Sequence, residues 1–356
     1  MSRFLHSKYN SLEPYDTSGE VESLTGYIRL NTNESPYPPS PKAIEYSHRA
    51  SMSMNYYSDP DCRELTSKLA SLMKIKPSQI VFGNGSDEIL NFIFMAFCEN
   101  GAAFPDLTYS FYRILAELHG VNYVTVPLRD FRVYPEDYAD MNKRTIFIAN
   151  PNAPTGIALS LNELERIINL NPESLIVIDE AYVDFGAESA LRFIDDYDNV
   201  IVVRTFSKSR SLAGGRLGWS MTNESLSRDI MNIKNTIAPY NINAMTQAAG
   251  IGTVEDEEYT QKNIAEICSE REITKKAMRE IGFDVIDSRT NFLFARHERI
   301  SGMEIFDSLK AKRIMIRHFS NPRISDWNRI TIGTHEQMQA MLEALKEITK
   351  EITKEA

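Results

Sequence analysis

The chain has 356 residues, of which 42% are hydrophobic and 25% charged, and its formal net charge is -10. These proportions are typical of a folded globular protein and exclude a chain that is disordered throughout. The negative net charge argues against nucleic acid or an anionic membrane as a partner of the whole molecule.

The cysteines and the first residues indicate a cellular compartment. Cys62, Cys98 and Cys268 lie far apart and form no CxxC pair, which excludes a disulfide framework and fits a reducing environment. The start of the chain is too polar for a secretory signal, and no run approaches the roughly 18 apolar residues of a membrane helix. We therefore expect a cytoplasmic protein with no membrane partner.

Residues 1–42 are rich in turn-forming residues and end in the sequence NESPYPPSPK. The four prolines of this sequence rule out a regular helix or a central strand, because proline lacks the backbone N–H that both structures need. We interpret the segment as an N-terminal arm that lies across the rest of the protein.

Between residues 43 and 243, helical segments alternate with short apolar runs rich in β-branched residues. Helices are expected at residues 62–73, 88–98 and 161–170, and strands at residues 80–82, 122–126, 145–150, 174–179 and 199–203. Nearly continuous apolar strands that alternate with helices are typical of a parallel sheet covered on both faces. The sequence therefore predicts a large α/β domain in this range.

From residue 244 to residue 356 the pattern changes to long charged helices with a few strands. Helices are expected at residues 263–283, at 302–312 and from about residue 335, and strands at residues 291–296, 314–317 and 329–333. This order indicates a second, smaller domain of α+β type.

The ends of the expected strands carry the candidate chemistry, because ligands of open parallel sheets bind beyond the carboxyl ends of the strands. After residues 80–82 comes GNGSDE, a glycine turn that opens a helix, whose N-terminal N–H groups can bind a phosphate. An ordinary glycine turn with a capped helix remains the alternative for this motif.

Two further strand ends carry an amide and a carboxylate. The turn NPNAPTG follows residues 145–149, where Asn152 either offers its side-chain amide to a ligand or belongs to a rigid connector. Asp179 ends the next expected strand, where its carboxylate would be partly desolvated and would need a cation or several donors. A simple helix N-cap is the alternative for Asp179.

The stretch RTFSKSRSLAGGRLGW follows residues 199–203 and holds four cations with no acidic residue. A lysine such as Lys208, desolvated and beside other cations, has a lowered pKa and can act as a nucleophilic amine. A single lysine is more often a surface charge. The indication of a functional site comes from the four strand ends together, which carry a glycine turn, an amide, a carboxylate and a lysine. Pyridoxal phosphate needs a lysine for its aldehyde, a carboxylate for its ring nitrogen and donors for its phosphate.

The motifs DEAYVDF, RTFSKSRSLAGGRLGW and NPNAPTG resemble those of the fold-type I, pyridoxal-phosphate-dependent aminotransferases, and within them the histidinol-phosphate aminotransferase family. The likeness runs nearly from end to end and includes IRLNTNESP, FGNGSDEIL and TNFLFAR. It implies a large domain with a mostly parallel seven-stranded sheet, a smaller C-terminal α+β domain and an N-terminal arm. It also implies a homodimer with shared active sites.

The resemblance assigns roles to individual residues. Lys208 would bind the cofactor aldehyde and move a proton, Asp179 would keep the ring nitrogen protonated, and Tyr182 would contact the ring hydroxyl. Tyr109 would stack on the ring, and the residues around the cofactor phosphate would be Ser86, Asp87, Thr205, Ser207, Arg216 and, from the second subunit, Tyr57. The residues near the substrates would be Tyr15, Asn33, Arg317 and Arg329.

One position departs from the family pattern. The family has an asparagine directly before PTG that donates to the ring hydroxyl, whereas this chain has Ala153. We expect the adjacent Asn152 to take over this contact.

The activity implied by the resemblance is amino transfer between L-glutamate and imidazole-acetol phosphate, which gives histidinol phosphate in histidine biosynthesis. A threonine-phosphate decarboxylase and a broad-range aromatic aminotransferase on the same scaffold remain alternatives. A catalytically silent relative would have lost Lys208 or Asp179, and both are present. The six histidines show no metal-ligand spacing, so no metal is expected.

Overall fold

The larger sheet of the molecule has seven strands, in the order β2-β8-β7-β6-β5-β3-β4. The structure is a computed structural model that describes residues 2–10, 12–13 and 25–355. The strands of this sheet are β2 (Ile80–Gly83), β3 (Ala102–Pro105), β4 (Tyr123–Val126), β5 (Thr145–Ala149), β6 (Ile176–Asp179), β7 (Val200–Thr205) and β8 (Gly218–Thr222). Only β8 runs antiparallel to its neighbours, so the predicted, mostly parallel sheet is confirmed.

Helices cover both faces of this sheet, because alternate residues of its strands point to opposite sides. In β6, Val177 packs in one apolar cluster, while Ile176 and Ile178 pack in another. The helices on the Val177 side are α3 (Ser86–Phe97), α4 (Phe111–His119) and α7 (Glu224–Ile237). Those on the opposite side are α2 (Arg63–Met73), α5 (Leu161–Leu170), α6 (Phe193–Asp196) and α8 (Ala244–Glu255).

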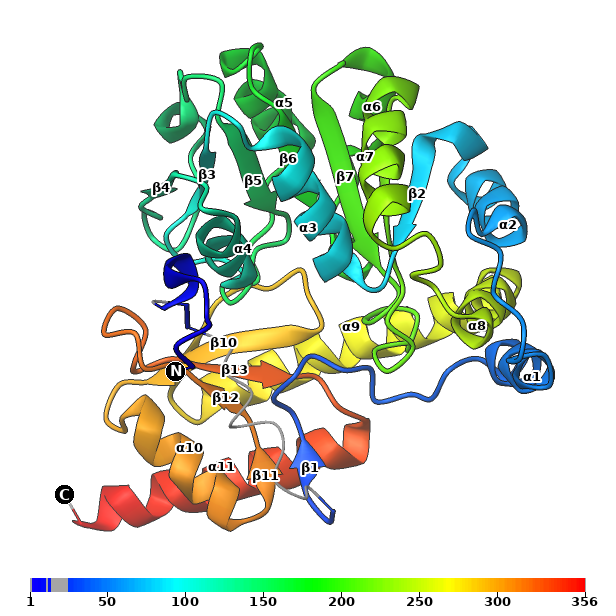
Figure 1. Cartoon of the computed structure of the whole chain (residues 1–356). Helices are drawn as coiled ribbons and strands as arrows, with labels where there is room; N and C mark the ends of the chain where they lie inside the picture. Colours follow the sequence, from blue (N-terminus) through cyan, green and yellow to red (C-terminus); the bar gives the residue numbers. More distant parts are fainter. Residues whose placement is uncertain (1, 11, 14–24, 356) are drawn as a thin grey trace.

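A second, antiparallel sheet has the order β12-β13-β10-β9 and lies below the larger sheet in Figure 1. Its strands are β9 (Phe283–Val285), β10 (Phe292–His297), β12 (Arg317–His318) and β13 (Asn328–Thr331). The helices that pack with it are α9 (Glu257–Glu280), α10 (Gly302–Ala311) and α11 (His335–Glu355). The strand expected at residues 314–317 is divided into β11 (Ile314–Met315) and β12.

The N-terminal arm joins this second layer before it reaches α1 (Pro41–Ser51). Strand β1 (Ile28–Arg29) pairs in parallel with β11, and the backbone N–H of Leu30 donates to the carbonyl oxygen of Met315. Helix α1 then packs against α8 on the side of the larger sheet. Helix α8 begins at residue 244, yet it packs with the larger sheet. The domain boundary expected at residue 243 stays a prediction.

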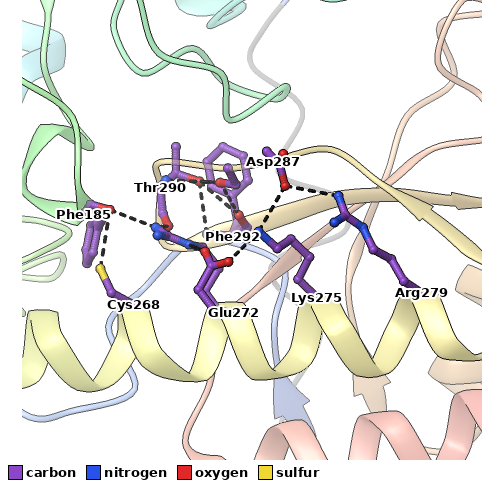
Figure 2. Close-up of polar contacts among 10 residues, drawn as sticks. Phe185, Cys268, Glu272, Lys275, Arg279, Asp287, Thr290 and Phe292 are labelled. Atoms are coloured by element: carbon purple, nitrogen blue, oxygen red, sulfur yellow. Dashed lines mark hydrogen bonds and ion pairs between the residues drawn. The ribbon is translucent and has the colours of Figure 1, made fainter.

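Helix α9 fastens the second sheet to the loop that follows β6. The buried Arg271 of α9 donates to the carbonyl oxygens of Phe185 and Thr290, at 2.9 and 2.8 Å. Figure 2 shows Lys275 and Arg279 of the same helix reaching Asp287. Among the described residues, no helix has the length and apolar character needed to cross a bilayer.

Candidate active site

The N-terminus of α3 forms the first part of the site. Gly85 caps the helix with φ +81°, a conformation that disfavours residues with a Cβ atom, and a Cβ atom there would meet Nη2 of Arg216 at 2.5 Å. A Cβ atom on Gly218 would lie 2.3 Å from the backbone nitrogen of Ser86. These glycines let a guanidinium and a strand approach the unpaired N–H groups of the helix, an arrangement that suits an anion.

Asp87 holds two other side chains of the site in place. Nη2 of Arg216 donates to Oδ2 of Asp87 at 2.7 Å, and the hydroxyl of Tyr109 donates to Oδ1 at 2.8 Å. The carboxylate of Asp87 therefore orients the guanidinium and the aromatic ring rather than facing an anion itself.

Thr205 and Ser207 lie at the end of β7, beside this helix terminus. Oγ1 of Thr205 donates to Oγ of Ser207 at 2.9 Å and accepts from the Ser207 backbone N–H at 3.0 Å. Thr205 pairs with Gly218 in the sheet, and Gly218 abuts Ser86, so the two hydroxyls and the α3 terminus meet at one edge.

Asp179 ends β6 and is 5% exposed. The hydroxyl of Tyr112 donates to its Oδ2 at 2.8 Å, and the backbone N–H of Ala181 donates to its Oδ1 at 3.1 Å. Burial raises the pKa of Asp179 to about 6, although these two hydrogen bonds act in the opposite direction. The sequence argument that this carboxylate needs several donors is confirmed, and the donors are a phenol and an amide.

Lys208 lies three residues beyond the end of β7, next to β6 in the sheet. Its Nζ donates to the carbonyl oxygen of Thr32 in the arm at 3.2 Å and lies 5.9 Å from the ring centroid of Tyr182. Desolvation, helped by the positive charge of Arg329, lowers the pKa of Lys208 to about 8. At pH 7 about a tenth of this amine is therefore unprotonated and nucleophilic, far more than of an ordinary lysine.

A buried ionic cluster supports the turn that contains Lys208. The sequence did not predict this cluster. Nε of Arg204 donates to Oε2 of Glu180 at 2.9 Å, and the Glu180 side chain is inaccessible to solvent. Arg204 also reaches Asp184, which accepts a 2.5 Å hydrogen bond from the hydroxyl of Ser209, the residue after Lys208. The one sequence feature that could have indicated the cluster is the second acidic residue, Glu180, directly after Asp179.

The arm and the second sheet close the site from the other side. Nδ2 of Asn33 donates to the Tyr182 hydroxyl at 2.8 Å, and Oδ1 of Asn33 accepts from the hydroxyl of Thr331 at 3.1 Å. Tyr182 packs edge-on against Phe292 of β10. Asn33 is buried and orients Tyr182, and its expected place beside a substrate stays a prediction.

Two arginines face this region from the second sheet. Arg317 of β12 pairs directly with Arg329 of β13, so both side chains leave the same face of the sheet. Like charges placed opposite each other are unfavourable unless an anion or an acid lies between them. Burial lowers the pKa of Lys208 and the charge of Arg329 adds to this effect, whereas burial raises the pKa of Tyr182 and the same charge opposes the rise. This guanidinium therefore lies close to the candidate amine.

The sequence matches the family model of aminotransferase class I and II over residues 25–345. The chain belongs to the class I and II aminotransferases. It is therefore an aminotransferase dependent on pyridoxal phosphate, as the motifs predicted.

Curated relatives agree with this assignment over nearly the whole length. The histidinol-phosphate aminotransferase of Brachyspira hyodysenteriae is 44% identical over 352 residues, which cover 96% of this chain and 98% of that protein. The protein of the same name from Lactococcus lactis subsp. lactis is 42% identical and covers 94% of this chain and 93% of its own.

Solved structures show the same fold. The histidinol-phosphate aminotransferase of Clostridium acetobutylicum matches with a TM-score of 0.85 at 26% identity, covering 91% of this chain and 99% of that one. The Sinorhizobium meliloti protein of that name, solved with pyridoxal-5'-phosphate, has a TM-score of 0.89 at 23% identity, with 99% of both chains covered.

The aminotransferase departs from the expectation at Asn152. Nδ2 of Asn152 donates to the carbonyl oxygen of Leu107 at 3.0 Å and to the hydroxyl of Thr155 at 3.1 Å, and its Oδ1 accepts from Thr108 at 2.8 Å. Both amide hydrogens are thus used within the protein, which counts against the predicted contact of Asn152 with the ring hydroxyl. The side chain instead braces the turn that contains Ala153.

One predicted residue, Tyr57, lies apart from this cluster. Tyr57 is 84% exposed and stacks on Tyr240, with ring centroids 4.6 Å apart. Tyr15 falls outside the described residues. The other predicted residues converge on the edge of the larger sheet or on the face of the second sheet that closes over it.

Proposed function

We propose that this aminotransferase transfers an amino group between L-glutamate and imidazole-acetol phosphate, giving L-histidinol phosphate and 2-oxoglutarate in histidine biosynthesis. The curated relatives with that name, 42 to 44% identical over most of the chain, support this choice of substrates. The observation that carries the chemistry is the position of Lys208, a desolvated amine just beyond β7, the strand that pairs with the strand of Asp179.

The residues fit pyridoxal phosphate at three points. When bound, this cofactor supplies a reactive aldehyde and a ring that accepts electrons. The N-terminus of α3 and Arg216 would hold its phosphate, because both offer donors to a dianion. Asp179 would hold a proton at the ring nitrogen, and Lys208 would bond to the aldehyde carbon and then move a proton at the substrate carbon.

Tyr182 and Tyr109 would hold the ring itself. The hydroxyl of Tyr182, oriented by Asn33, would donate to the ring hydroxyl, which Ala153 cannot do. Tyr109, fixed through its bond to Asp87, would stack on the ring face.

The pair of Arg317 and Arg329 favours a substrate that carries a doubly charged group such as a phosphate. Arg317 and Arg329 project from one face of the second sheet, and guanidinium groups bind phosphate and carboxylate through paired hydrogen bonds. The same pair would hold the phosphate of one substrate and the distal carboxylate of glutamate in the other half-reaction.

The deciding experiment follows the absorbance of the purified protein with pyridoxal phosphate. Attachment to Lys208 gives a band above about 400 nm. We expect glutamate to remove this band and imidazole-acetol phosphate to restore it, with histidinol phosphate as the product. A spectrum that glutamate leaves unchanged, or release of carbon dioxide from threonine phosphate, would overturn the proposal in favour of another activity on this scaffold.

We further infer a cytoplasmic homodimer whose subunits share active sites. Met52, Met54, Tyr56 and Tyr57, in the turn after α1, are 63 to 84% exposed, more apolar surface than a monomer normally shows to water in one segment. The three free thiols fit a reducing compartment.

Mixed dimers test the sharing of sites. A Lys208→Ala subunit combined with a Tyr57→Ala subunit contains one fully intact site only if Tyr57 acts across the interface. We expect such mixtures to show activity well above that of either variant alone but below half of the wild-type value, because each mixed dimer has one intact site of its two. Activity that stays at the level of the separate variants would refute the shared site.

A further inference from the structure

Tyr112 is a buried tyrosine to which neither the motifs nor the proposed chemistry assigns a role. It is the second residue of α4 and is fully buried. Its hydroxyl donates to Oδ2 of Asp179 at 2.8 Å, across 67 residues of sequence. Among the described residues, this carboxylate accepts one other hydrogen bond, from the backbone N–H of Ala181.

An aromatic cage fixes the Tyr112 ring. Phe104 and Phe147 pack against it with centroids 5.9 and 5.5 Å away, and Tyr109 meets it edge-on at 5.8 Å and 86°. Phe104, Phe147 and Tyr112 are all buried, so water does not compete for the hydrogen bond that Tyr112 donates to Asp179. Tyr109 and Tyr112 are three residues apart and their rings are in contact, so the residue proposed to stack on the cofactor ring supports the residue that holds the acid.

We propose that Tyr112 is a positioning residue that keeps Asp179 ionised and thereby keeps the proton of that pair on the cofactor's ring nitrogen. This inference rests on the proposed binding of pyridoxal phosphate. A carboxylate that already accepts a hydrogen bond is less basic, and so it competes less well for a proton shared with a neighbouring base. The ring accepts electrons best when its nitrogen is protonated.

The surroundings of Asp179 show why such a donor is needed. Burial and the negative charges of Asp87 and Glu180 all favour the protonated acid, and the Tyr112 hydroxyl and the Ala181 N–H oppose them. Burial also raises the pKa of Tyr112 well above its usual range, so the phenol remains a donor. Arg204 cannot serve this purpose, because its guanidinium is committed to Glu180 and Asp184.

The test compares Tyr112→Phe, which removes only the hydroxyl, with Tyr138→Phe as a matched control. Tyr138 is equally buried, and within the described part of the chain its hydroxyl has no hydrogen-bond partner. Two quantities are measured on each purified variant: the affinity of the cofactor-free protein for pyridoxal phosphate, and the ¹⁵N chemical shift of the ring nitrogen in the labelled complex.

We expect Tyr112→Phe to move the ¹⁵N shift toward that of an unprotonated ring and to weaken cofactor binding about ten-fold, as loss of a hydrogen bond to a charged group implies. Tyr138→Phe should change neither quantity. In an Asp179→Asn background the interaction is already lost. Adding Tyr112→Phe should therefore change the affinity less than about two-fold and leave the ¹⁵N shift nearly unchanged. Fluorotyrosine at position 112, a stronger donor, should move the ¹⁵N shift the opposite way and keeps the test valid if the phenylalanine variant folds poorly.

The inference is wrong if Tyr112→Phe leaves both quantities at wild-type values, or if its full effect persists beside Asp179→Asn. A wild-type protein that binds no pyridoxal phosphate would instead refute the proposed function. Intact wild-type binding with an unaffected Tyr112→Phe variant would refute the role of Tyr112 alone.

Discussion

The two sides of the candidate site are built in different ways. On the side of the larger sheet, Ser86, Asp179 and Lys208 each lie at a strand end or within three residues of one, and most of their neighbours belong to the same sheet or its helices. On the opposite side, Asn33 bonds Thr331, and Arg329 donates to the carbonyl oxygen of Asn31, both across 298 residues of sequence. The first side is set by local chain geometry, and the second exists only when the arm lies on the second sheet.

This difference suggests a division of labour. The groups proposed to hold the cofactor lie on the buried strands or just after them and have hydrogen-bond partners within the protein. Their geometry therefore persists when a substrate leaves. Groups proposed to hold substrates lie on the arm and on the second sheet, so their positions depend on contacts between segments that are remote in sequence. Substitutions on the two sides should therefore fail in different measurements.

The largest expected effect is that of Lys208→Ala on the larger-sheet side. Loss of the only proposed acid–base group should lower kcat by about 10⁴-fold. The absorbance band above about 400 nm should vanish while the melting temperature changes little, because removal of a desolvated amine leaves no buried charge. A variant that keeps this band with bound cofactor would show that another amine binds the aldehyde.

The next effect concerns the ionic cluster behind Lys208. Glu180→Ala leaves the buried Arg204 without its principal partner, which should cost about 3 to 5 kcal/mol of unfolding free energy. Denaturant unfolding of the cofactor-free protein measures this. Glu224→Ala, which removes the exposed partner of Lys76, serves as the control and should leave the midpoint unchanged. Equal midpoints for both variants would show that the cluster contributes nothing.

A smaller effect follows from the raised pKa of Asp179. The unfolded carboxyl ionises near its ordinary pKa of 3.8 and the folded one at about 6, so the unfolded state releases its proton first. The stability that this group contributes is complete below about pH 4 and is lost as pH rises through 6. Relative to wild type, cofactor-free Asp179→Asn should therefore become more stable by about 2 to 3 kcal/mol between pH 4 and pH 8. A pH-independent difference in unfolding free energy would contradict this.

The smallest effect lies on the substrate side. Arg329→Gln should raise KM for the phosphorylated substrate and for glutamate about ten-fold, since one charge-assisted hydrogen bond is lost. The affinity for pyridoxal phosphate should stay the same, which separates the two sides. Arg296→Gln, on β10 of the same sheet and bonded to Asp284, is the matched control and should leave KM unchanged. If Arg329→Gln weakens cofactor binding and Arg296→Gln does not, the proposed separation of cofactor-binding and substrate-binding sides is wrong.

Much of the larger sheet was predictable because its strands are short apolar runs, each buried between helices. Strands β3 and β8 were missed. The first is the short run Ala102–Pro105, which ends in proline, and the second, Gly218–Thr222, lies immediately after the glycine-rich loop. The division of residues 314–317 into two strands was also missed, because β11 pairs with the distant β1. Pairing with a remote segment leaves no local periodicity to detect.

The sequence by itself determined the α/β class, the family and the strand ends at which Ser86, Asp179 and Lys208 stand, because each depends on local pattern and spacing. Only the tertiary structure decided which side chains meet there: Tyr112 on Asp179, Asn33 on Tyr182, and Arg317 opposite Arg329. It also placed the amide of Asn152 between the carbonyl oxygen of Leu107 and the hydroxyl of Thr155. The physical reason is that a buried polar group must find partners wherever the folded chain brings them, and those partners lie far away in the sequence.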